Sequence, residues 1–396
     1  MLKNKFIKYK DIKIRLVFQM FEIYYYALFI LKKIFKKKLI FKADEISSIL
    51  VIRRDMLWDF IISFPSLIKL KLAFPEAKIY FIWTKWVKSL FSIIREDFFD
   101  QYYLIDPNFW LPKFIRSKAQ YLQKKTWEKD DYEKIFELKD RIDLWIDLRW
   151  DLFSLKLLND LNVKKIISYN ICWWSFYIDD KVPYNKDLIE KLHDVDLVDY
   201  AISEYWAIKS ERKINLSVMI KDWVISDSEP IEQYICIQPG WWRWDYRRWP
   251  EGKYIELINK CLSTSPKTNI KLLCADAFEE LICKRILSKI SDKNQVIITK
   301  SEKWQSTIDI INNSILFIGH DTSTAHLCDM LDHSWIILFW PWDRKLFAPK
   351  NDNIKIIYHE YDCQPCEQRK CKFPLNSCMN QIGVGEIVEE IKYVYK

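Results

Sequence analysis

The stretch that decides the fold runs from Ile46 to Asp59 and reads ISSILVIRRDMLWD. Its first half, Ile46 to Ile52, is short, apolar and mostly β-branched, as expected for a buried strand. An apolar helical stretch follows at residues 60–74, and residues 78–83 predict the next strand. A strand, a helix and a strand in this order are typical of a parallel α/β unit.

The same pattern restarts in the second half, where strands are expected to alternate with helices. The expected strands are residues 234–238, 269–274, 295–298, 315–318 and 335–339. The expected helices are residues 254–261, 277–290 and one from about Ser323. A chain of 396 residues exceeds the size of one ordinary core, so two domains are expected. We predict two doubly wound Rossmann-like domains, residues 46–228 and 229–396, that face each other across a cleft.

Positive charge is concentrated at the N-terminus. The chain carries a net charge of +8, and residues 1–42 alone hold twelve lysines and arginines against two acidic residues. Residues 16–31 are apolar and aromatic but shorter than the roughly 20 residues of a spanning helix. We interpret residues 1–45 as a basic amphipathic arm on an anionic membrane surface, since this pattern favours lipid over nucleic acid. An ordinary helix packed on the body of the protein is the alternative.

The ten cysteines divide into two groups. Six are scattered in apolar contexts, and buried thiols in a reducing compartment explain them without disulfides. The other four are clustered, and a Cys-x-x-Cys pair with two further thiols has the ligand number of a structural zinc or iron–sulfur site. A loop braced by reduced thiols is the alternative. The clustered residues are Cys363, Cys366, Cys371 and Cys378.

Tryptophan outnumbers glycine by nineteen to five, which inverts the usual proportion. A folded chain carries roughly 7% glycine, because turns and close backbone approaches need a residue without a side chain. Trp58, Trp241, Trp242 and Trp340 stand at turn-rich ends of expected elements. We hypothesise that many tryptophans are glycines in the cell, encoded by a reassigned stop-type codon. The alternative is that they are genuine aromatic residues.

Three segments follow expected strands and reach the sheet edge where doubly wound domains bind ligands, namely residues 58–59, 238–250 and 319–326. These segments and their neighbours carry four motifs. The motifs are LVIRRDMLWD at 50–59, QPG at 238–240 with DYRRWP at 245–250, GHDTSTAHL at 319–327 and FWP at 339–341. In this order and at these separations they resemble the motifs of the bacterial ADP-heptose:lipopolysaccharide heptosyltransferases, glycosyltransferase family 9. The resemblance covers roughly residues 46–392, with many tryptophans where the family has glycine.

The resemblance implies a GT-B fold, with an acceptor-side domain at residues 46–228 and a nucleotide-sugar domain at residues 229–396. It implies an inverting transfer of a heptose-like sugar from an ADP-sugar donor to a lipid-linked or lipopolysaccharide-type glycan acceptor. No metal or other cofactor is required for catalysis in that family. We therefore expect a cytoplasmic protein that the arm holds on the inner face of the cytoplasmic membrane.

On the acceptor side, Asp59 matches the aspartate of the family's Leu-Gly-Asp signature, which implies the role of general base. Inversion needs a carboxylate within hydrogen-bond reach of the acceptor hydroxyl as that hydroxyl attacks the anomeric carbon. Asp59 as the N-cap of the following helix is the alternative. His193 resembles a family histidine ahead of the linker helix and is a candidate for acceptor handling, with a purely structural histidine as its alternative.

On the donor side, Arg247 matches a cationic family position and has Arg248 beside it. Without a metal, such fixed cations and amide dipoles must stabilise the leaving diphosphate, although two arginines in a loop are often only solvated. Asp321 is a candidate to hold the sugar or order its loop, with a helix cap as the alternative. Glu279 or Glu280 resembles the acidic residue that binds the donor ribose. The expected donor-binding residues are Gly240, Trp242, Arg247, Arg248, Glu279, Glu280, Asp321, Thr322, Ser323 and His326.

Two other functions remain open at this stage. The motifs describe diphosphate handling better than sugar identity, so another nucleotide sugar is one alternative. A non-catalytic, membrane-bound binding protein is the other, if genuine Trp58, Trp242 and Trp340 side chains close the cleft.

Overall fold

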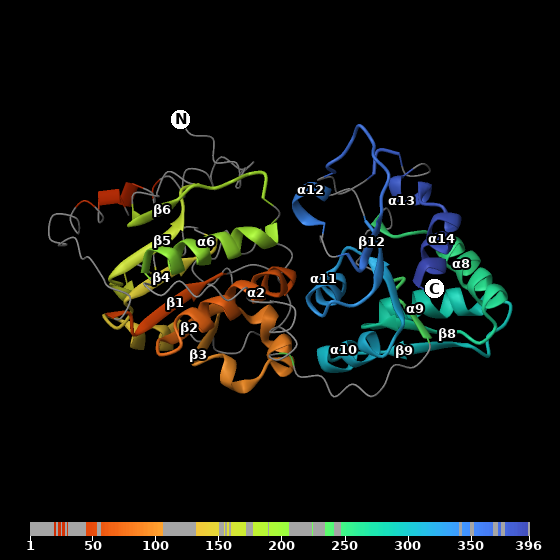
Figure 1. Ribbon diagram of the computed structural model, residues 1–396, viewed down its shortest axis with the longest axis horizontal. Helices are drawn as coiled ribbons and strands as arrows, with labels where there is room; N and C mark the ends of the chain where they lie inside the picture. The colour runs from red at the N-terminus through yellow and green to blue at the C-terminus, as the bar shows by residue number, and fades with distance from the viewer. Residues whose placement is uncertain are drawn as a thin grey trace. The chain divides into compact units, whose positions relative to one another are not determined.

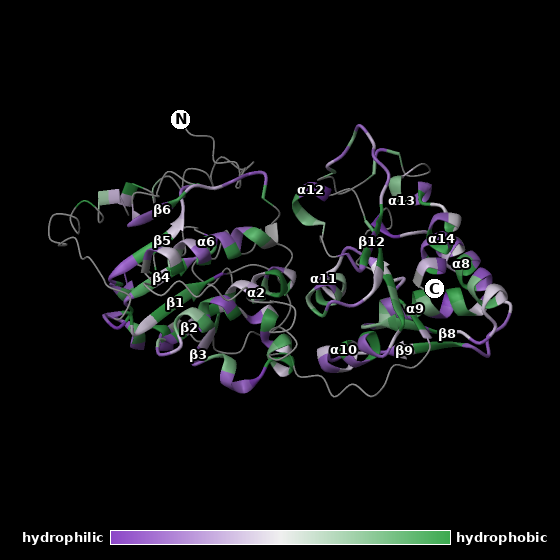
Figure 2. Ribbon diagram, in the orientation of Figure 1, coloured by the Kyte–Doolittle hydropathy of each residue, from purple (hydrophilic) through white to green (hydrophobic). Residues whose placement is uncertain are grey.

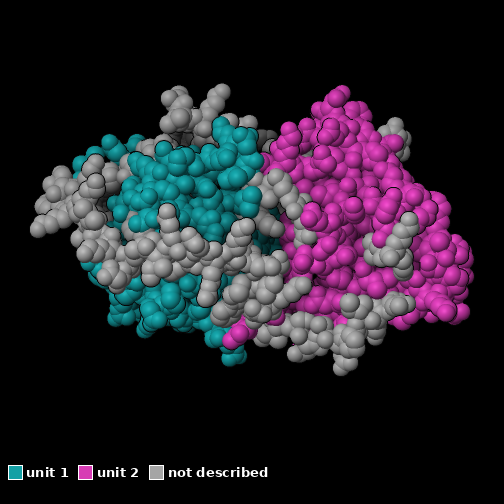
Figure 3. Space-filling model, in the orientation of Figure 1, with its two compact units in different colours: residues 1–88, 96–214 teal, residues 89–95, 215–396 magenta. Residues whose placement is uncertain are grey.

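The computed structural model divides the chain into two compact units, coloured separately in Figure 3. Unit 1 comprises Met1–Lys88 and Glu96–Ile214, and unit 2 comprises Ser89–Arg95 and Asn215–Lys396. The domain boundary that we predicted after Ser228 falls in a stretch outside the described residues and stays a prediction.

The structure describes most of both units but little of the N-terminal arm. The described ranges are residues 45–53, 57–105, 132–149, 160–171, 177–188, 190–205, 234–240, 247–339, 343–348, 352–366, 371–373 and 377–394, with single residues at 20, 23, 24, 26, 27, 30, 154, 157 and 224. Most of the expected arm and the candidate Trp242 lie outside them, as do Trp241 and Trp340. Within these ranges, no helix has both the length and the apolar character needed to cross a membrane.

Unit 1 is built on a parallel sheet with the strand order β3-β2-β1-β4-β5-β6 (Figure 1). Its strands are β1 (Ser48–Ile52), β2 (Lys78–Thr84), β3 (Gln101–Ile105), β4 (Leu144–Asp147), β5 (Lys165–Tyr169) and β6 (Asp180–Val182). The predicted first strand is therefore present, and it lies at the centre because β1 pairs with both β2 and β4. Every residue of β1 is buried, which explains its apolar, β-branched sequence.

Helices of unit 1 bring its candidate residues to the sheet. They are α2 (Leu57–Ala73), η3 (Glu96–Phe98), α4 (Tyr132–Ile135), η4 (Phe136–Leu138) and α6 (Glu190–Tyr205). Helix η2 (Lys85–Ile93) begins in unit 1 and ends in the segment Ser89–Arg95 of unit 2. The helix predicted at residues 60–74 begins earlier, at Leu57, and continues through Pro65. Asp59 consequently lies within the first turn of α2 and not at its N-cap. Helices α2 and α6 pack against each other.

Unit 2 repeats the arrangement with a sheet in the order β12-β11-β10-β7-β8-β9. Its strands are β7 (Tyr234–Ile237), β8 (Asn269–Cys274), β9 (Val296–Lys300), β10 (Leu316–His320), β11 (Trp335–Leu338) and β12 (Ile354–Ile357). In both units the first strand in the chain lies beside the second and the fourth, which is the order of a Rossmann-type sheet. The predicted pair of doubly wound domains is confirmed.

Helices of unit 2 surround its sheet. They are α8 (Glu251–Thr264), α9 (Ala277–Ser288), α10 (Trp304–Asn312), α11 (Ser323–Met330), α12 (Arg344–Phe347), α13 (Cys378–Gln381) and α14 (Val384–Val394). Helix α8 buries Tyr254, Leu257, Ile258 and Cys261, whose spacing places them on one face. Burying a side chain such as Leu257 contributes roughly 1.5–3 kcal/mol.

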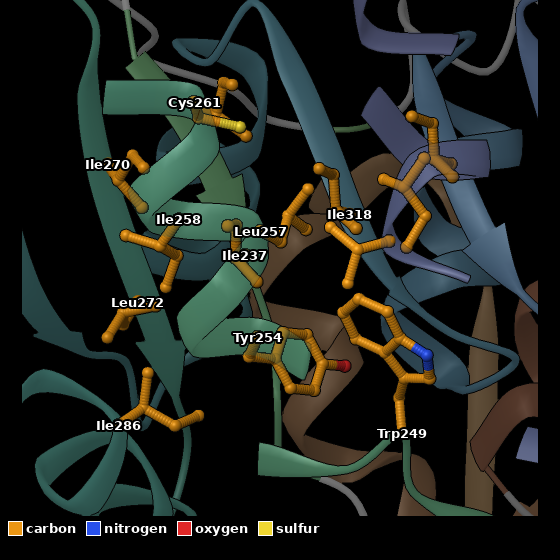
Figure 4. Packing of buried hydrophobic residues seen from close by; sticks show 14 of the residues in the cluster. Ile237, Trp249, Tyr254, Leu257, Ile258, Cys261, Ile270, Leu272, Ile286 and Ile318 are labelled. Carbon is orange, nitrogen blue, oxygen red and sulfur yellow. The ribbon is translucent and has the colours of Figure 1, made fainter. Parts of the chain in front are cut away.

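The core beneath α8 also contains the buried side chain of Trp249. Figure 4 shows Trp249 and Tyr254 close together beside Leu257, Ile237 and Ile318. The hydropathy colouring of Figure 2 shows the central strands of each unit as mainly hydrophobic and many outer turns as hydrophilic. In each unit, the loops at the strand ends therefore extend from a packed apolar core.

Candidate functional site

The candidate base Asp59 lies in a buried ion-pair cluster of unit 1. Its Oδ1 is 3.4 Å from Nη2 of Arg53, and Asp59 is only 6% exposed. Arg53 follows the carboxyl end of β1 and also forms an ion pair with Asp194 of α6. One guanidinium therefore ties the central strand to both α2 and α6. This end of a doubly wound sheet is where such domains bind ligands.

The cluster determines how Asp59 can act. Ser63 lies 2.5 Å from Oδ2 of Asp194 and 2.6 Å from the carbonyl oxygen of Asp59, and its single hydrogen can serve one of them at a time. Arg53 is 3% exposed, so removing either carboxylate would leave a buried cation with less compensation. An ion pair with a guanidinium favours an ionised carboxylate, and ionised is the form that a general base requires.

His193 has surroundings that fit the structural alternative. It is 4% exposed, and its Nε2 donates to the carbonyl oxygen of Asn185 at 2.8 Å. Its ring lies 4.3 Å from the ring of Tyr184, measured between centroids. Its own carbonyl oxygen accepts a hydrogen bond from the Tyr169 hydroxyl. These contacts fix the start of α6, directly ahead of Asp194, and a role in acceptor handling stays a prediction.

In unit 2, several donor candidates come together at the carboxyl ends of β7 and β8. Gly240 follows β7 and lies so close to Glu279 that a Cβ atom on it would be 2.6 Å from the Glu279 Cγ. Glu279 accepts the backbone N–H of Ala275 at 2.7 Å and a side-chain hydrogen bond from Gln238. Burial raises the pKa of the Glu279 carboxyl above its usual value. The structure thus places this carboxylate against the glycine loop.

Glu280 has different surroundings although it is the next residue. Its carboxylate pairs with Lys284 at 2.5 Å, one turn further along α9. The hydrogen bond from Lys284 lowers the pKa of the Glu280 carboxyl. Because successive residues of a helix point about 100° apart, only one of the two glutamates can face the Gly240 loop, and that residue is Glu279.

The two arginines are partly withdrawn from solvent rather than fully solvated. Arg247 is 8% exposed. The guanidinium carbon of Arg248 lies 5.2 Å from the ring centroid of Phe278, which is part of α9. Burial lowers the pKa of the Arg248 guanidinium from its usual value. A guanidinium held on an aromatic face is less free to move, which suits it to fixed anion binding.

The third donor segment begins helix α11. Asp321 Oδ1 lies 3.2 Å from His326 Nε2, so these two candidates contact each other across the first turn. Thr322 occupies the N-cap position without capping the helix through its side chain, and Asp321 is not the cap. The Thr322 hydroxyl is buried and has no hydrogen-bond partner among the described residues. With Ser323 as the first helical residue, this N-terminus presents amides that can receive an anion.

His320, the last residue of β10, was not among the predicted site residues. His320 is 2% exposed, and its Nε2 accepts the backbone N–H of Trp249 at 3.0 Å. The hydroxyl of Tyr254 lies 3.3 Å from the same nitrogen. A histidine at the end of a buried strand, directly ahead of Asp321, was the signal that could have identified it.

The four clustered cysteines do not form the expected metal site within the described residues. Cys363, Cys366, Cys371 and Cys378 are free thiols, and no group of three or more His, Cys, Asp or Glu side chains described here is placed to hold a metal. Burial raises the pKa of the Cys378 thiol to about 11. The zinc or iron–sulfur expectation therefore gains no support.

The part of the chain that matches a known family begins in α6 of unit 1 and covers most of unit 2. Residues 191–376 match the family model described as glycosyltransferase family 9 (heptosyltransferase). Lipooligosaccharide heptosyltransferase 2 of Campylobacter jejuni is 24% identical over 166 residues, which cover 41% of this chain and 51% of the relative. The chain thus spans about half the length of the curated relatives that it matches.

Solved structures agree over nearly the whole fold. The E. coli heptosyltransferase WaaC with ADP has a TM-score of 0.63 at 15% identity, covering 88% of this chain and 99% of its own. The E. coli ADP-heptose lps heptosyltransferase II has a TM-score of 0.58 at 15% identity, covering 88% and 98%. At this identity the likeness shows the fold, which is GT-B. Residues 191–376, a little less than half of the chain, are thus similar to glycosyltransferase family 9 (heptosyltransferase), and the fold resembles that of the solved heptosyltransferases.

Proposed function

We propose that this protein transfers a heptose-like sugar from an ADP-sugar donor to a lipid-linked or lipopolysaccharide-type glycan, with inversion and without a catalytic metal. The observation that carries the proposal is a set of cationic, acidic and amide groups at the strand ends of unit 2. Arg247, Arg248 and the N-terminus of α11 supply positive charge, and Glu279 supplies a carboxylate beside Gly240. Relatives solved with ADP support the choice of nucleotide.

In the proposed reaction, Asp59 accepts the proton of the acceptor hydroxyl as its oxygen attacks the anomeric carbon. The bond from that carbon to the diphosphate breaks at the same time, and ADP leaves with the electron pair. Arg247, Arg248, Thr322 and the α11 amides stabilise the charge that develops on the diphosphate, as preorganised dipoles and cations do in other enzymes. Proton transfer to a positioned base contributes roughly 10²–10⁴ in rate.

The replacement Asp59→Asn tests the assignment of the base. It keeps the size of the side chain and removes its basicity, so we expect turnover of ADP-heptose to fall by about 10² or more. Because Asp59 belongs to unit 1 and the nucleotide to unit 2, the dissociation constant for ADP should stay within about twofold of the unsubstituted value. Steady-state kinetics and calorimetry measure the two quantities.

Glu280→Gln is the matched control, since it removes a carboxylate that pairs on the surface with Lys284. Its turnover and ADP affinity should both be unchanged. If Asp59→Asn weakened ADP binding and turnover equally, or left turnover intact, Asp59 would not be the base. A melting temperature measured for each variant separates these outcomes from loss of the fold, because Asp59 is paired with buried Arg53.

A separate experiment tests which nucleotide sugar is the donor. ADP-heptose should be turned over faster than ADP-, UDP- or GDP-hexoses at equal concentration, with ADP as an inhibitor. Faster turnover of another nucleotide sugar would favour the alternative donor. A protein with tryptophan confirmed at positions 58, 242 and 340 and no measurable nucleotide affinity would instead be a binding protein.

We further propose that residues 1–45 hold the protein on the cytoplasmic face of the membrane. The twelve basic residues near the N-terminus support this proposal, since each one near an anionic surface contributes about 1 kcal/mol. Cosedimentation of the full chain with phosphatidylserine vesicles, and not with phosphatidylcholine vesicles, is the expected result. Equal binding to both vesicles, or to neither, would remove the electrostatic basis of this proposal.

A further inference from the structure

His320 lies at a junction between two donor segments of unit 2 that are far apart in the chain. It ends β10 and directly precedes Asp321 and Thr322. Its Nε2 accepts the backbone N–H of Trp249, which directly follows Arg247 and Arg248. A single side-chain hydrogen bond therefore joins the arginine segment to the segment that starts α11.

The protonation state of His320 suits it to this contact. Burial, together with the charge of nearby Arg248, lowers the pKa of the His320 imidazole to about 3. The ring is thus neutral at physiological pH. With Nε2 as the acceptor, the hydrogen must be on Nδ1. Nδ1 is buried and has no hydrogen-bond partner among the described residues. Nε2 is the ring nitrogen that accepts the hydrogen bond from the backbone of Trp249.

Trp249 is held at its other end as well. Its indole Nε1 donates to the carbonyl oxygen of Ile382 at 3.0 Å, and its ring meets that of Tyr254 edge to face at 4.8 Å. Lys253 donates to the same Ile382 carbonyl oxygen. The side chain of Trp249 is therefore fixed to the frame of unit 2, and His320 fixes its backbone relative to β10.

We propose, on the basis of the function proposed above, that His320 is a positioning residue for the donor diphosphate. By holding the Trp249 backbone, it aligns Arg247 and Arg248 with Thr322 and the α11 amides on the same anion. It does not touch the reacting atoms. The loss of this alignment should weaken the binding of donor and ADP more than it slows the chemical step, because Asp59 belongs to unit 1.

Two replacements of His320 distinguish the role of Nε2 from that of Nδ1. The side chain of His320→Gln can place an acceptor oxygen near the position of Nε2, whereas His320→Asn places its amide near Nδ1 and cannot reach Trp249. We expect His320→Asn to raise the dissociation constant for ADP and the KM for the donor by about tenfold, the effect of one lost hydrogen bond of about 1.4 kcal/mol. The kcat should change by less than about threefold, and His320→Gln should restore values near those of the unsubstituted protein.

Hydrogen exchange at the Trp249 amide of the full chain provides a second measurement. Protection should be kept in His320→Gln and lost in His320→Asn, with both variants folded by near-UV circular dichroism. The proposal is overturned if both variants bind ADP as the unsubstituted protein does, or if kcat falls while KM and ADP affinity do not change. It is overturned too if His320→Asn unfolds while His320→Gln, folded, still binds ADP tenfold more weakly. An unsubstituted protein that binds no ADP would contradict the proposed function itself.

Discussion

Glu279 and Glu280 illustrate how neighbouring residues acquire different roles at the residue scale. The carboxylate of Glu279 lies against Gly240 and accepts hydrogen bonds from Ala275 and Gln238. That of Glu280 pairs with Lys284 on the surface of α9. The resemblance to the family left the choice open, and the direction in which each side chain leaves the helix favours Glu279 as the ribose ligand.

We predict that Glu279→Gln raises the dissociation constant for ADP by about tenfold, since hydrogen bonds to a charged acceptor are worth about 1.5–3 kcal/mol. The neighbouring Glu280→Gln should leave it unchanged. Calorimetric titration with ADP measures both variants. Equal effects of the two replacements, or a larger effect at Glu280, would show that the ribose ligand is assigned to the wrong residue.

Tryptophans can be tested one by one for the glycine hypothesis. Trp83, Trp145 and Trp335 are buried in strands, and their indole N–H groups have no acceptor among the described residues. Burying such a donor costs about 1–3 kcal/mol. Trp249 is equally buried but donates to Ile382. We predict that peptides of the protein from its own cells contain glycine at the first three positions and tryptophan at Trp249.

Tandem mass spectrometry of that natural protein decides the matter, with the codons of the gene as an independent check. One codon shared by Trp83, Trp145, Trp335 and Trp58, and a different codon at Trp249, would agree with the peptides. Tryptophan found in all of these peptides would end the hypothesis. The binding-protein alternative, which needs genuine tryptophans at positions 58, 242 and 340, would then gain ground.

At the scale of elements, the loops that connect strands to helices determine which candidate donor residues come together. The loop after β7 passes α9 so closely that only a residue without a Cβ fits at position 240. The loop before α8 is held at Trp249 by His320 and by Ile382. The hydrophobic periodicity of α8 shows which face is buried, but it contains no information about either contact.

Two glycines provide a matched pair of replacements. Gly240→Ala should lower the stability and ADP affinity of the protein, because the added Cβ would lie 2.6 Å from the Glu279 Cγ. Gly252→Ala, near the start of α8 with open space around its Cα, should raise stability by up to about 1 kcal/mol and leave ADP binding intact. Denaturant unfolding and calorimetry test both; an unaffected Gly240→Ala would refute the close approach.

The whole molecule consists of two units, each with a Rossmann-type sheet and the same strand order. No short repeat is visible in the sequence, so the duplication of the architecture is seen only in the fold. The candidate base belongs to unit 1 and the donor candidates to unit 2. Because the two sets of candidates belong to different units, the effect of ADP on the stability of each unit can be measured separately.

We predict that ADP stabilises unit 2 selectively. At 100 times its dissociation constant a ligand contributes about 2.7 kcal/mol to the state that binds it. Hydrogen exchange of the full chain, followed by mass spectrometry, should therefore show slower exchange in peptides from residues 234–339 and little change in those from β1, β4 and β5. Equal protection of both units, or protection of unit 1 alone, would contradict the assignment of the nucleotide to unit 2.

The sequence by itself determined the class of fold and the order of its motifs. Short β-branched runs such as Ile46–Ile52 predict buried strands because burial on both faces requires apolar side chains. The motifs at 238–250 and 319–327 predicted which strand ends carry the donor candidates. Strands β3, β5, β6 and β12 were not predicted; β5, β6 and β12 are short and contain charged residues beside their apolar ones.

Only the tertiary structure decided which side chains meet. Arg53 and Asp194 are separated by 141 positions in the chain, and Trp249 and His320 by 71, yet each pair forms a buried hydrogen bond. Local propensity and periodicity act over a few residues, whereas such contacts depend on how strands and helices pack. For the same reason the sequence could name Glu279 and Glu280 together, and the packing of α9 against the Gly240 loop distinguished them.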